Sequence, residues 1–269
     1  MSKPEMQKIA VYLSMDQNDT SLIHAGTRLA GIFGKALRLI CVNKGTGFQG
    51  DTDGKIREYT ENILRTAPGL KVSASVLKNP GIRLSGILAD DMEIIILVAG
   101  TAKFRELSET LRRSPIPFLF LNEGLPFSSE FRKIIIPVDM RRQNKDSLLW
   151  SVFFGRNNQS EIIAIGASDR SRESRKEVDA HLRSLKNLLG KTNIGHKIYK
   201  GNHGSMSVQR EALETAGLLG ADLIILLGST YLTWLDRLLG LPEEKIIRKA
   251  GNLPVLLVNP RRETYLVCD

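Results

Sequence analysis

Short apolar segments alternate with longer amphipathic ones through the first half of the chain. The apolar runs are typical of strands buried on both faces of a parallel sheet, and apolar residues three or four positions apart are typical of helices. The predicted strands are Lys8–Leu13, Leu37–Val42, Val72–Leu77, Glu93–Val98 and Pro117–Leu121. The predicted helices are Thr20–Phe33, Lys55–Thr66, Ile82–Ala89 and Ala102–Arg113. This alternation predicts a doubly wound α/β fold with a five-stranded parallel sheet.

The same pattern then starts again. The sequence KIIIPVD at Lys133–Asp139 repeats KIAVYLS at Lys8–Ser14, and LPVLLVN at Leu253–Asn259 repeats IPFLFLN at Ile116–Asn122. An internal repeat of this length indicates two copies of one fold. We therefore predict two tandem domains, residues 1–125 and 126–269, joined near a linker rich in Gly, Pro and Ser.

The second half contains the same kinds of element in the same order. The predicted strands are Lys133–Asp139, Glu161–Ile165, Ile194–Tyr199, Asp222–Leu227 and Pro254–Val258. The predicted helices are Asp146–Phe154, Arg172–Leu189, Val208–Leu219 and a stretch around Ile246–Ala250. An apolar strand at the edge of a sheet needs a cover, so we expect the last strand of each half, 117–121 and 254–258, to pair with the other within the chain.

A glycine turn follows the strand Asp222–Leu227. Gly228 lies where this strand reaches the carboxyl edge of the sheet, which is the place where open α/β sheets bind ligands. The connection from this strand to the next is eight residues longer in the second copy than in the first. A long loop over Gly228–Gly240 could wrap a phosphate, whereas the short Gly100–Arg113 connection could not.

Three segments resemble the universal stress protein family: KIIIPVD at 133–139, DLIILLGS at 222–229 and PVLLVNP at 254–260. The resemblance covers nearly the whole chain as a tandem pair and is weaker in the first copy. It implies the five-stranded fold and, in one branch of the family, ATP bound by an Asp of the first strand and a loop of pattern G-x-x-G-(nine residues)-G-(S/T). Asp139 matches that Asp, Gly228 matches the first glycine, and Ala167 matches a residue whose backbone contacts adenine.

The sequence departs from that pattern at several positions. Tyr231 replaces the second glycine, Gly240 follows after eight residues instead of nine, and Leu241 replaces the hydroxyl residue. In the first copy Ser14 stands where the Asp belongs, and the loop is missing. The candidate nucleotide-binding residues are Asp139, Ala167, Gly228, Ser229, Tyr231, Gly240 and Leu241. We predict an altered nucleotide cleft in the second half and none in the first.

The charge and composition of the chain restrict the classes of partner that we expect. The net charge is +9, but the basic residues are scattered, except at Arg141–Arg142 and Arg170–Lys176, so a solvated surface is favoured over a nucleic-acid patch. No apolar run approaches the roughly 18 residues of a membrane span and no leader opens the chain, so we expect a cytoplasmic protein. Cys41 is expected to be a buried thiol, and the histidines show no spacing typical of a metal site. The sequence shows no set of residues with the types and spacing of a known catalytic site.

For two of the candidate binding residues, a purely structural role is an open alternative. Asp139 could bind a ligand or accept N–H bonds in its own turn, and Gly228 could serve only as a tight turn. Three hypotheses follow. The leading one is a non-catalytic binding or regulatory protein of the stress response, without a cofactor, whose halves form a pseudo-dimer and which could also form homo-oligomers. The second is an ATP- or AMP-binding protein with slow ATPase activity, and the third is a nucleic-acid module.

Overall fold

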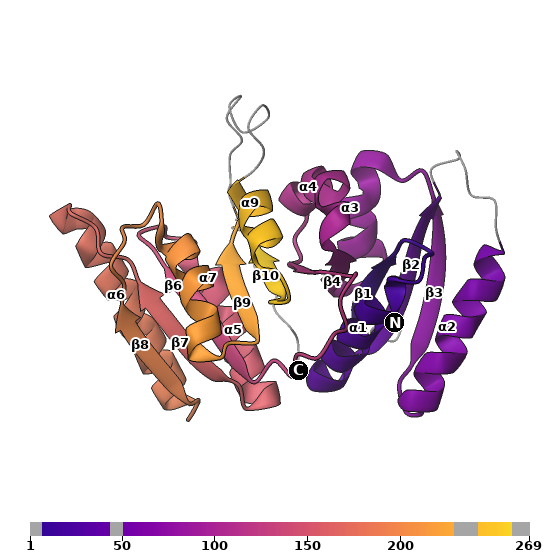
Figure 1. Cartoon of the computed structure of the whole chain (residues 1–269), viewed down its shortest axis with the longest axis horizontal. Coiled ribbons are helices and arrows are strands. Elements are labelled where there is room, and N and C mark those ends of the chain that lie inside the picture. The colour runs from indigo at the N-terminus through magenta and orange to yellow at the C-terminus, as the bar shows by residue number, and fades with distance from the viewer. Residues whose placement is uncertain (1–6, 44–50, 229–241, 260–269) are drawn as a thin grey trace, which may run out of the picture. The chain divides into compact units, whose positions relative to one another are not determined.

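The computed structural model describes residues 7–43, 51–228 and 242–259 (Figure 1). These residues divide into two compact units between Ser128 and Ser129. In each unit the described strands form a parallel five-stranded sheet with helices in the crossover connections. The predicted α/β fold class is confirmed.

Unit 1 has the strand order β3-β2-β1-β4-β5. Its strands are β1 (Lys8–Leu13), β2 (Ala36–Asn43), β3 (Val72–Lys78), β4 (Ile94–Gly100) and β5 (Phe118–Leu121). Its helices are α1 (Asp19–Phe33), α2 (Thr52–Thr66), α3 (Leu84–Gly86) and α4 (Phe104–Arg113), with shorter turns η1 (Gly81–Arg83), η2 (Ile87–Asp91) and η3 (Thr101–Lys103). The order reverses direction at β1 and β4, which is the topological switch point of a doubly wound sheet.

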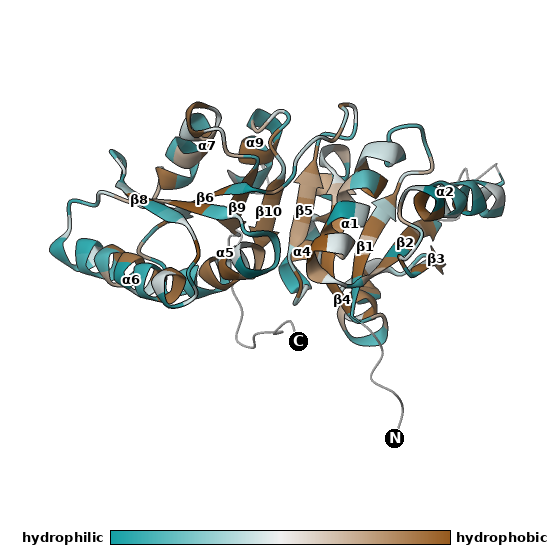
Figure 2. Ribbon diagram, turned by 90° about the horizontal axis from the view of Figure 1, so that it is seen from below, coloured by the Kyte–Doolittle hydropathy of each residue, from teal (hydrophilic) through white to brown (hydrophobic). Residues whose placement is uncertain are grey.

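Unit 2 repeats this topology with the order β8-β7-β6-β9-β10. Its strands are β6 (Lys133–Val138), β7 (Glu161–Gly166), β8 (His196–Lys200), β9 (Leu223–Leu227) and β10 (Val255–Val258). Its helices are α5 (Asn144–Asn158), α6 (Arg172–Lys191), α7 (Val208–Leu219) and α9 (Pro242–Lys249). Figure 2 shows α5 and α6 on one face of these strands and α7 and α9 on the other, as right-handed crossovers require.

Burial along the strands follows their place in each sheet. In the central strands β4 and β9 every residue is buried, because helices cover both faces. The edge strand β3 instead alternates between exposed and half-buried side chains. The continuous and the alternating apolar patterns of the sequence therefore correspond to central and edge positions.

Helix α1 ends where the sequence predicted. Gly34 has a φ of 61°, and the N–H of the following Lys35 donates to the carbonyl of Ala30. A left-handed residue is needed at this C-cap, and glycine adopts it without steric cost. Cys41 in β2 is fully buried and unpaired, as expected, and burial raises the pKa of its thiol.

Several predicted boundaries were wrong in detail. The predicted strands 117–121 and 254–258 begin one residue later, at Phe118 and Val255, although the carbonyls of Pro117 and Pro254 accept from the neighbouring strands β4 and β9. Proline has no N–H to donate, so it cannot form a full ladder residue. The predicted helix Ile82–Ala89 is a succession of 3₁₀, α and π turns.

Asp222 was also predicted to lie in a strand, but β9 begins at Leu223. Its carboxylate accepts from the N–H groups of Arg132 and Lys133, both at 2.9 Å. Ser129 donates its hydroxyl to the carbonyl of Asp222. Asp222 thus anchors the segment that enters β6, and its own N–H donates to the carbonyl of Lys133 just before β9 begins.

Candidate functional site

The carboxyl edge of unit 2 brings three of the predicted site residues together. Val138 lies opposite Gly166, and Ile135 lies opposite Ile224. Carried on by the parallel register, these pairings place Asp139, Ala167 and Gly228 side by side where β6, β7 and β9 end. All three residues are buried, with Asp139 only 2% exposed.

Donors from the same turn form hydrogen bonds to both carboxylate oxygens of Asp139. Oδ1 accepts from the backbone N–H of Arg141 and from Nδ2 of Asn144, both at 2.8 Å. Oδ2 accepts from Nε of Arg141 at 2.8 Å and from Nη2 of the same guanidinium at 2.6 Å. A carboxylate offers about four acceptor directions, so Asp139 is saturated by its own turn.

Arg141 also reaches the adjacent strand. Its Nη2 lies 3.4 Å from the carbonyl oxygen of Leu227, and its Nη1 lies 3.3 Å from that of Gly228. Gln209 of α7 donates to the same Leu227 carbonyl at 3.0 Å. The Arg141 guanidinium therefore bridges the ends of β6 and β9, while its side chain stays one-third exposed.

Asn144, at the start of α5, completes this turn. Its amide nitrogen donates to Oδ1 of Asp139 and also to the backbone carbonyls of Asp139 and Arg141, both at 2.7 Å. Asn144 itself is fully buried. The spacing Asp139-x-Arg141-x-x-Asn144 thus builds a closed turn that satisfies the Asp139 carboxylate, whereas the buried Oδ1 of Asn144 has no hydrogen-bond partner.

Backbone groups near Ala167 are committed as well. The N–H of Ala167 donates to the carbonyl of Val138, and the N–H of Ser168 donates to the carbonyl of His203. The Ser168 hydroxyl donates to the carbonyl of Gly201 at 2.5 Å. The N–H of Ala167, a residue whose backbone groups the family resemblance assigns to adenine, is consequently used inside the sheet.

Two carboxylates hold the loop after β8 against this edge. Asp169 accepts from the N–H of Ser205 at 2.9 Å and from its hydroxyl at 2.6 Å. The hydroxyl oxygen of Ser205 in turn accepts from the N–H of Met140, which follows Asp139. Glu211 accepts from the N–H groups of Asn202 and His203. The rim of the site is therefore ordered by hydrogen bonds and not by packing alone.

The remaining predicted site residues, Ser229, Tyr231, Gly240 and Leu241, lie outside the described residues. Within the described residues, no group of three or more His, Cys, Asp or Glu side chains is arranged to hold a metal ion. The described part of the site is thus a polar turn at a strand edge, in which the Asp139 carboxylate is saturated.

The corresponding edge of unit 1 uses different groups. Ser14 follows β1 as Asp139 follows β6, and here the carboxylate comes from Asp19 in α1, which accepts from the N–H groups of Ser14 (2.8 Å) and Met15 (2.7 Å). Lys55 of α2 donates to the carbonyl of Met15, and the Tyr59 hydroxyl donates to that of Asp16. Burial raises the pKa of Asp19, and burial together with Asp19 and Asp16 raises that of Tyr59 to about 12.

In unit 1 the turn after β4 binds a carboxylate side chain of the same chain. The Glu123 carboxylate accepts from the N–H of Ala102 and from the Thr101 hydroxyl, both at 3.2 Å. A Cβ on Gly100 would come within 2.5 Å of this carboxylate, so only glycine allows such an approach. Glu123 therefore sits at a helix start, where N–H groups and the helix dipole favour negative charge.

Sequence reasoning missed the roles of Arg141, Asn144, Asp19 and Glu123. Arg141 was noted only as part of a basic pair. One signal was available, because an arginine two residues after a buried carboxylate can fold back onto it, and an Asn three residues later can cap the same turn. No comparable local signal marks Glu123, whose partners are about twenty residues away.

Three solved structures have a fold similar to that of this chain, and two of them are described as universal stress proteins. A universal stress protein from Archaeoglobus fulgidus is 14% identical, with a TM-score of 0.63 over 95% of this chain and 98% of that one. A putative universal stress protein from Pseudomonas aeruginosa is 15% identical, with a TM-score of 0.65 over 95% of this chain and 94% of that one. A functionally unknown protein from Pseudomonas aeruginosa gives 15% identity and a TM-score of 0.63 over 95% and 93%.

The chain therefore has the fold of universal stress proteins, and the fold expected from the sequence resemblance is confirmed. No family model and no curated protein matches the sequence. Among the described helices, none has both the length and the apolar character that crossing a bilayer requires.

Proposed function

We propose that the protein is a tandem, non-catalytic binding protein of the universal stress protein kind, acting in the cytoplasm in a stress or regulatory response. In this proposal its nucleotide cleft is degenerate. The observation that carries it is the saturation of Asp139 by Arg141 and Asn144. The carboxylate that would recognise a nucleotide already has its partners.

The energetic consequence can be estimated. A nucleotide that used Asp139 would first have to displace the Arg141 guanidinium from its charge-assisted bonds. Two such bonds are worth about 3–6 kcal/mol, and the lower end applies because Arg141 is partly exposed. A loss of about 3 kcal/mol weakens binding by about two orders of magnitude. A micromolar site would become one of roughly 0.1 mM or weaker.

A calorimetric titration with Mg-ATP and with AMP tests this proposal. We expect no binding tighter than about 0.1 mM for the wild-type protein. Arg141→Ala should tighten binding, because it frees Asp139, whereas the matched control Arg142→Ala removes an exposed neighbouring arginine and should behave like wild type. Low-micromolar binding by the wild type that Asp139→Ala abolishes would contradict the proposal.

One observation favours a second candidate, an adenine-nucleotide-binding protein with slow ATPase activity. Asp139, Ala167 and Gly228 meet at one edge, and Arg141 is exposed enough to move aside. This candidate requires the wild type to bind ATP and to release phosphate at a rate that Asp139→Ala lowers. Absence of both signals leaves the non-catalytic role as the better explanation.

We further propose that the two halves form a pseudo-dimer through their last strands, at 117–121 and 254–258. Leu119 and Leu256, at corresponding places in β5 and β10, are both fully buried. Apolar last strands of this kind need a cover, and each copy can supply one for the other.

A further inference from the structure

Two methionines from distant parts of the chain lie on the same rim of unit 2. Met140 follows Asp139 at the end of β6, and Met206 lies in the loop between β8 and α7. The N–H of Met140 donates to the hydroxyl oxygen of Ser205 at 3.0 Å, so the two segments are in contact. Together with the covalent bonds on either side, this contact puts the Cα atoms of Met140 and Met206 at most roughly 11 Å apart. Each side chain has three rotatable bonds, so both thioethers can turn toward one point.

Both of these methionines are exposed. Met206 is 95% exposed and Met140 is 43% exposed. The other methionines among the described residues, Met15 and Met92, are buried in unit 1. In the part of the chain that the structure describes, the methionine side chains open to solvent are therefore the two that meet on this rim.

Hydrogen bonds fix the loop that carries Met206. Asp169 accepts from the N–H and the hydroxyl of Ser205, and the N–H of Ser207 donates to the carbonyl of Gly204 at 2.9 Å. A Cβ on Gly204 would lie 2.8 Å from Oδ1 of Asp169, so this close approach favours glycine. The backbone at Met206 is thus held in place while its side chain projects into solvent.

His203 adds a nitrogen ligand next to the methionines. Its Nδ1 lies 3.4 Å from Oε2 of Glu211, a carboxylate that is nine-tenths buried. A proton on Nδ1 shared with this carboxylate leaves the lone pair on Nε2, and the imidazole is half exposed. Histidines that bind metals typically have such a carboxylate partner on the second ring nitrogen. His203 stands three residues before Met206 in the same ordered loop.

The types of these side chains favour a soft cation. Thioether sulfur and imidazole nitrogen suit Cu(I), whereas Mg²⁺ and Ca²⁺ require oxygen ligands. The carboxylates of this rim already accept hydrogen bonds, Asp139 from its own turn and Asp169 from Ser205. The ligands left for an ion are consequently the two sulfurs and one nitrogen.

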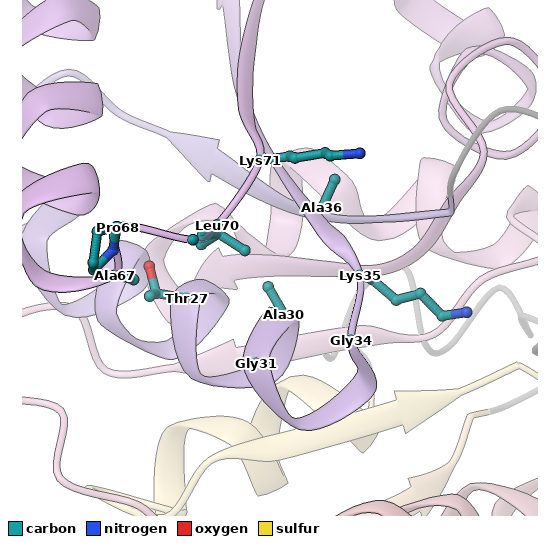
Figure 3. Close-up of a pocket in the computed structure, with 11 residues that line it drawn as sticks. Thr27, Ala30, Gly31, Gly34, Lys35, Ala36, Ala67, Pro68, Leu70 and Lys71 are labelled. Carbon is teal, nitrogen blue, oxygen red and sulfur yellow. The ribbon is translucent and has the colours of Figure 1, made fainter.

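The recess of about 440 Å³ in unit 1 offers no comparable ligands. It lies at the amino edge of that sheet, between the end of α1 and the segment before β3 (Figure 3). Its lining residues, all of them described, include no Met, His or Cys. Figure 3 also shows the Lys35 and Lys71 side chains extending away from the recess. The soft ligands are therefore a feature of the unit 2 rim and not of a large cavity.

We infer that Met140, His203 and Met206 bind one Cu(I) ion. The two thioether sulfurs and Nε2 of the imidazole are its three ligands, and Glu211 orients the imidazole. The copper stays in the same oxidation state, and the site uses none of the groups assigned to the nucleotide cleft.

Anaerobic titration of the full-length protein with Cu(I), in competition with the coloured chelator bathocuproine disulfonate, tests the inference. Every protein carries Cys268→Ser, because a thiol also binds Cu(I). We expect one Cu(I) per chain. Met140→Leu, His203→Gln and Met206→Leu should each weaken binding at least about tenfold, since loss of an outer partner alone typically costs that much. Leucine is close to methionine in volume, so these variants should fold.

Two controls match these substitutions. Met92→Leu removes a buried methionine, and His24→Gln removes an exposed histidine of α1 in unit 1. Both variants should bind Cu(I) as the parent does. X-ray absorption at the copper edge adds a readout that a purely structural role would not change. The loaded parent should show sulfur and nitrogen neighbours, and the Met140→Leu/Met206→Leu double variant should lose the sulfur neighbours.

Four results would overturn the inference. They are a parent protein that takes no Cu(I) from the chelator, methionine variants with unchanged affinity, an absorption spectrum without sulfur neighbours, and displacement of Cu(I) by equimolar Zn²⁺. The first two reject the site, the third rejects the thioether ligands, and the fourth rejects a site selective for a soft cation. None of these results bears on the Mg-ATP titration, so the two proposals fail separately.

Discussion

The two units differ most where their sheets are most alike, at the carboxyl edge. In unit 2 a cation, Arg141, is held on the acidic residue that follows the first strand. In unit 1 an anion, Glu123, is held on the turn that follows the fourth strand. Each copy therefore fills one part of the same edge with its own side chain.

This difference shows that one sheet topology can satisfy the same edge in two ways. The topology fixes where strand ends and helix starts expose donors and acceptors, and those groups must be satisfied by a ligand, by water or by the chain. Unit 2 satisfies a carboxylate with a guanidinium, and unit 1 satisfies helix-start donors with a carboxylate. Both solutions leave the fold intact and satisfy donors or acceptors at this edge from within the chain.

The largest effect on the stability of the two units is expected from a charge placed in the last strand of either unit, and this change tests the comparison between them. Leu119→Lys and Leu256→Lys each bury an ammonium group at a fully buried position. An unpaired buried charge costs more than about 4 kcal/mol, which is enough to unfold a marginally stable unit. Ile82→Lys, at a position that is 62% exposed, is the control and should have little effect.

Tryptophan fluorescence reports on unit 2 alone, because Trp150 and Trp234 both fall within its residue range, Ser129–Thr264. It therefore distinguishes the unfolding of unit 2 from that of unit 1. Leu256→Lys should abolish the cooperative fluorescence transition. Leu119→Lys should remove about half of the helical circular dichroism and lower the midpoint of that transition without abolishing it. Loss of all structure in both variants would refute two separate domains, and an unchanged midpoint in Leu119→Lys would refute pairing through the last strands.

A smaller effect is expected from Asp19, the residue of unit 1 that closes the turn after the first strand. Asp19→Ala leaves the N–H groups of Ser14 and Met15 without their acceptor. Unsatisfied buried donors cost about 1–3 kcal/mol each, and relief of the buried charge offsets part of this, so we expect a loss of about 2 kcal/mol. Asp16→Ala, which removes an exposed bond to the N–H of Asn18, is the control. Urea unfolding followed by circular dichroism measures both.

The pH dependence of unit 1 provides a second test of Asp19. Its pKa is raised in the folded protein, chiefly by burial, so the folded state keeps the proton to higher pH than the unfolded chain does. Stability should therefore fall as the pH rises from the unfolded pKa, about 3.9, through the folded pKa. Asp19→Ala should remove this decline. A decline of unchanged size in the variant would assign it to another group.

The fold was predictable from the sequence because burial is periodic. The continuous apolar runs at β4 and β9, the stripe in α1 and its Gly34 cap each carry a local physical signal. The edge Asp139–Ala167–Gly228 was also predictable, since topology alone brings strand ends together. For the occupants of the site, the only local signal was the short spacing from Asp139 to Arg141 and Asn144, and their longer contacts had none. Arg141 reaches Gly228, and Glu123 reaches Thr101, through side-chain geometry that no periodicity reports.

The smallest effect is expected from Glu123→Gln, which tests the unit 1 side of the comparison. The glutamine keeps the shape of the side chain and one acceptor oxygen, but it removes the negative charge at the helix start. A charge at this position is worth about 0.3–1 kcal/mol, so the loss of stability should lie in that range and should shrink in 1 M salt. Glu109→Gln, which changes an exposed glutamate in the middle of α4 paired with Arg113, is the control. Urea unfolding at low and high ionic strength measures both variants. A loss for Glu123→Gln that is no larger than the control's, or that does not respond to salt, would show that Glu123 only fills space at this turn and does not serve as its anion.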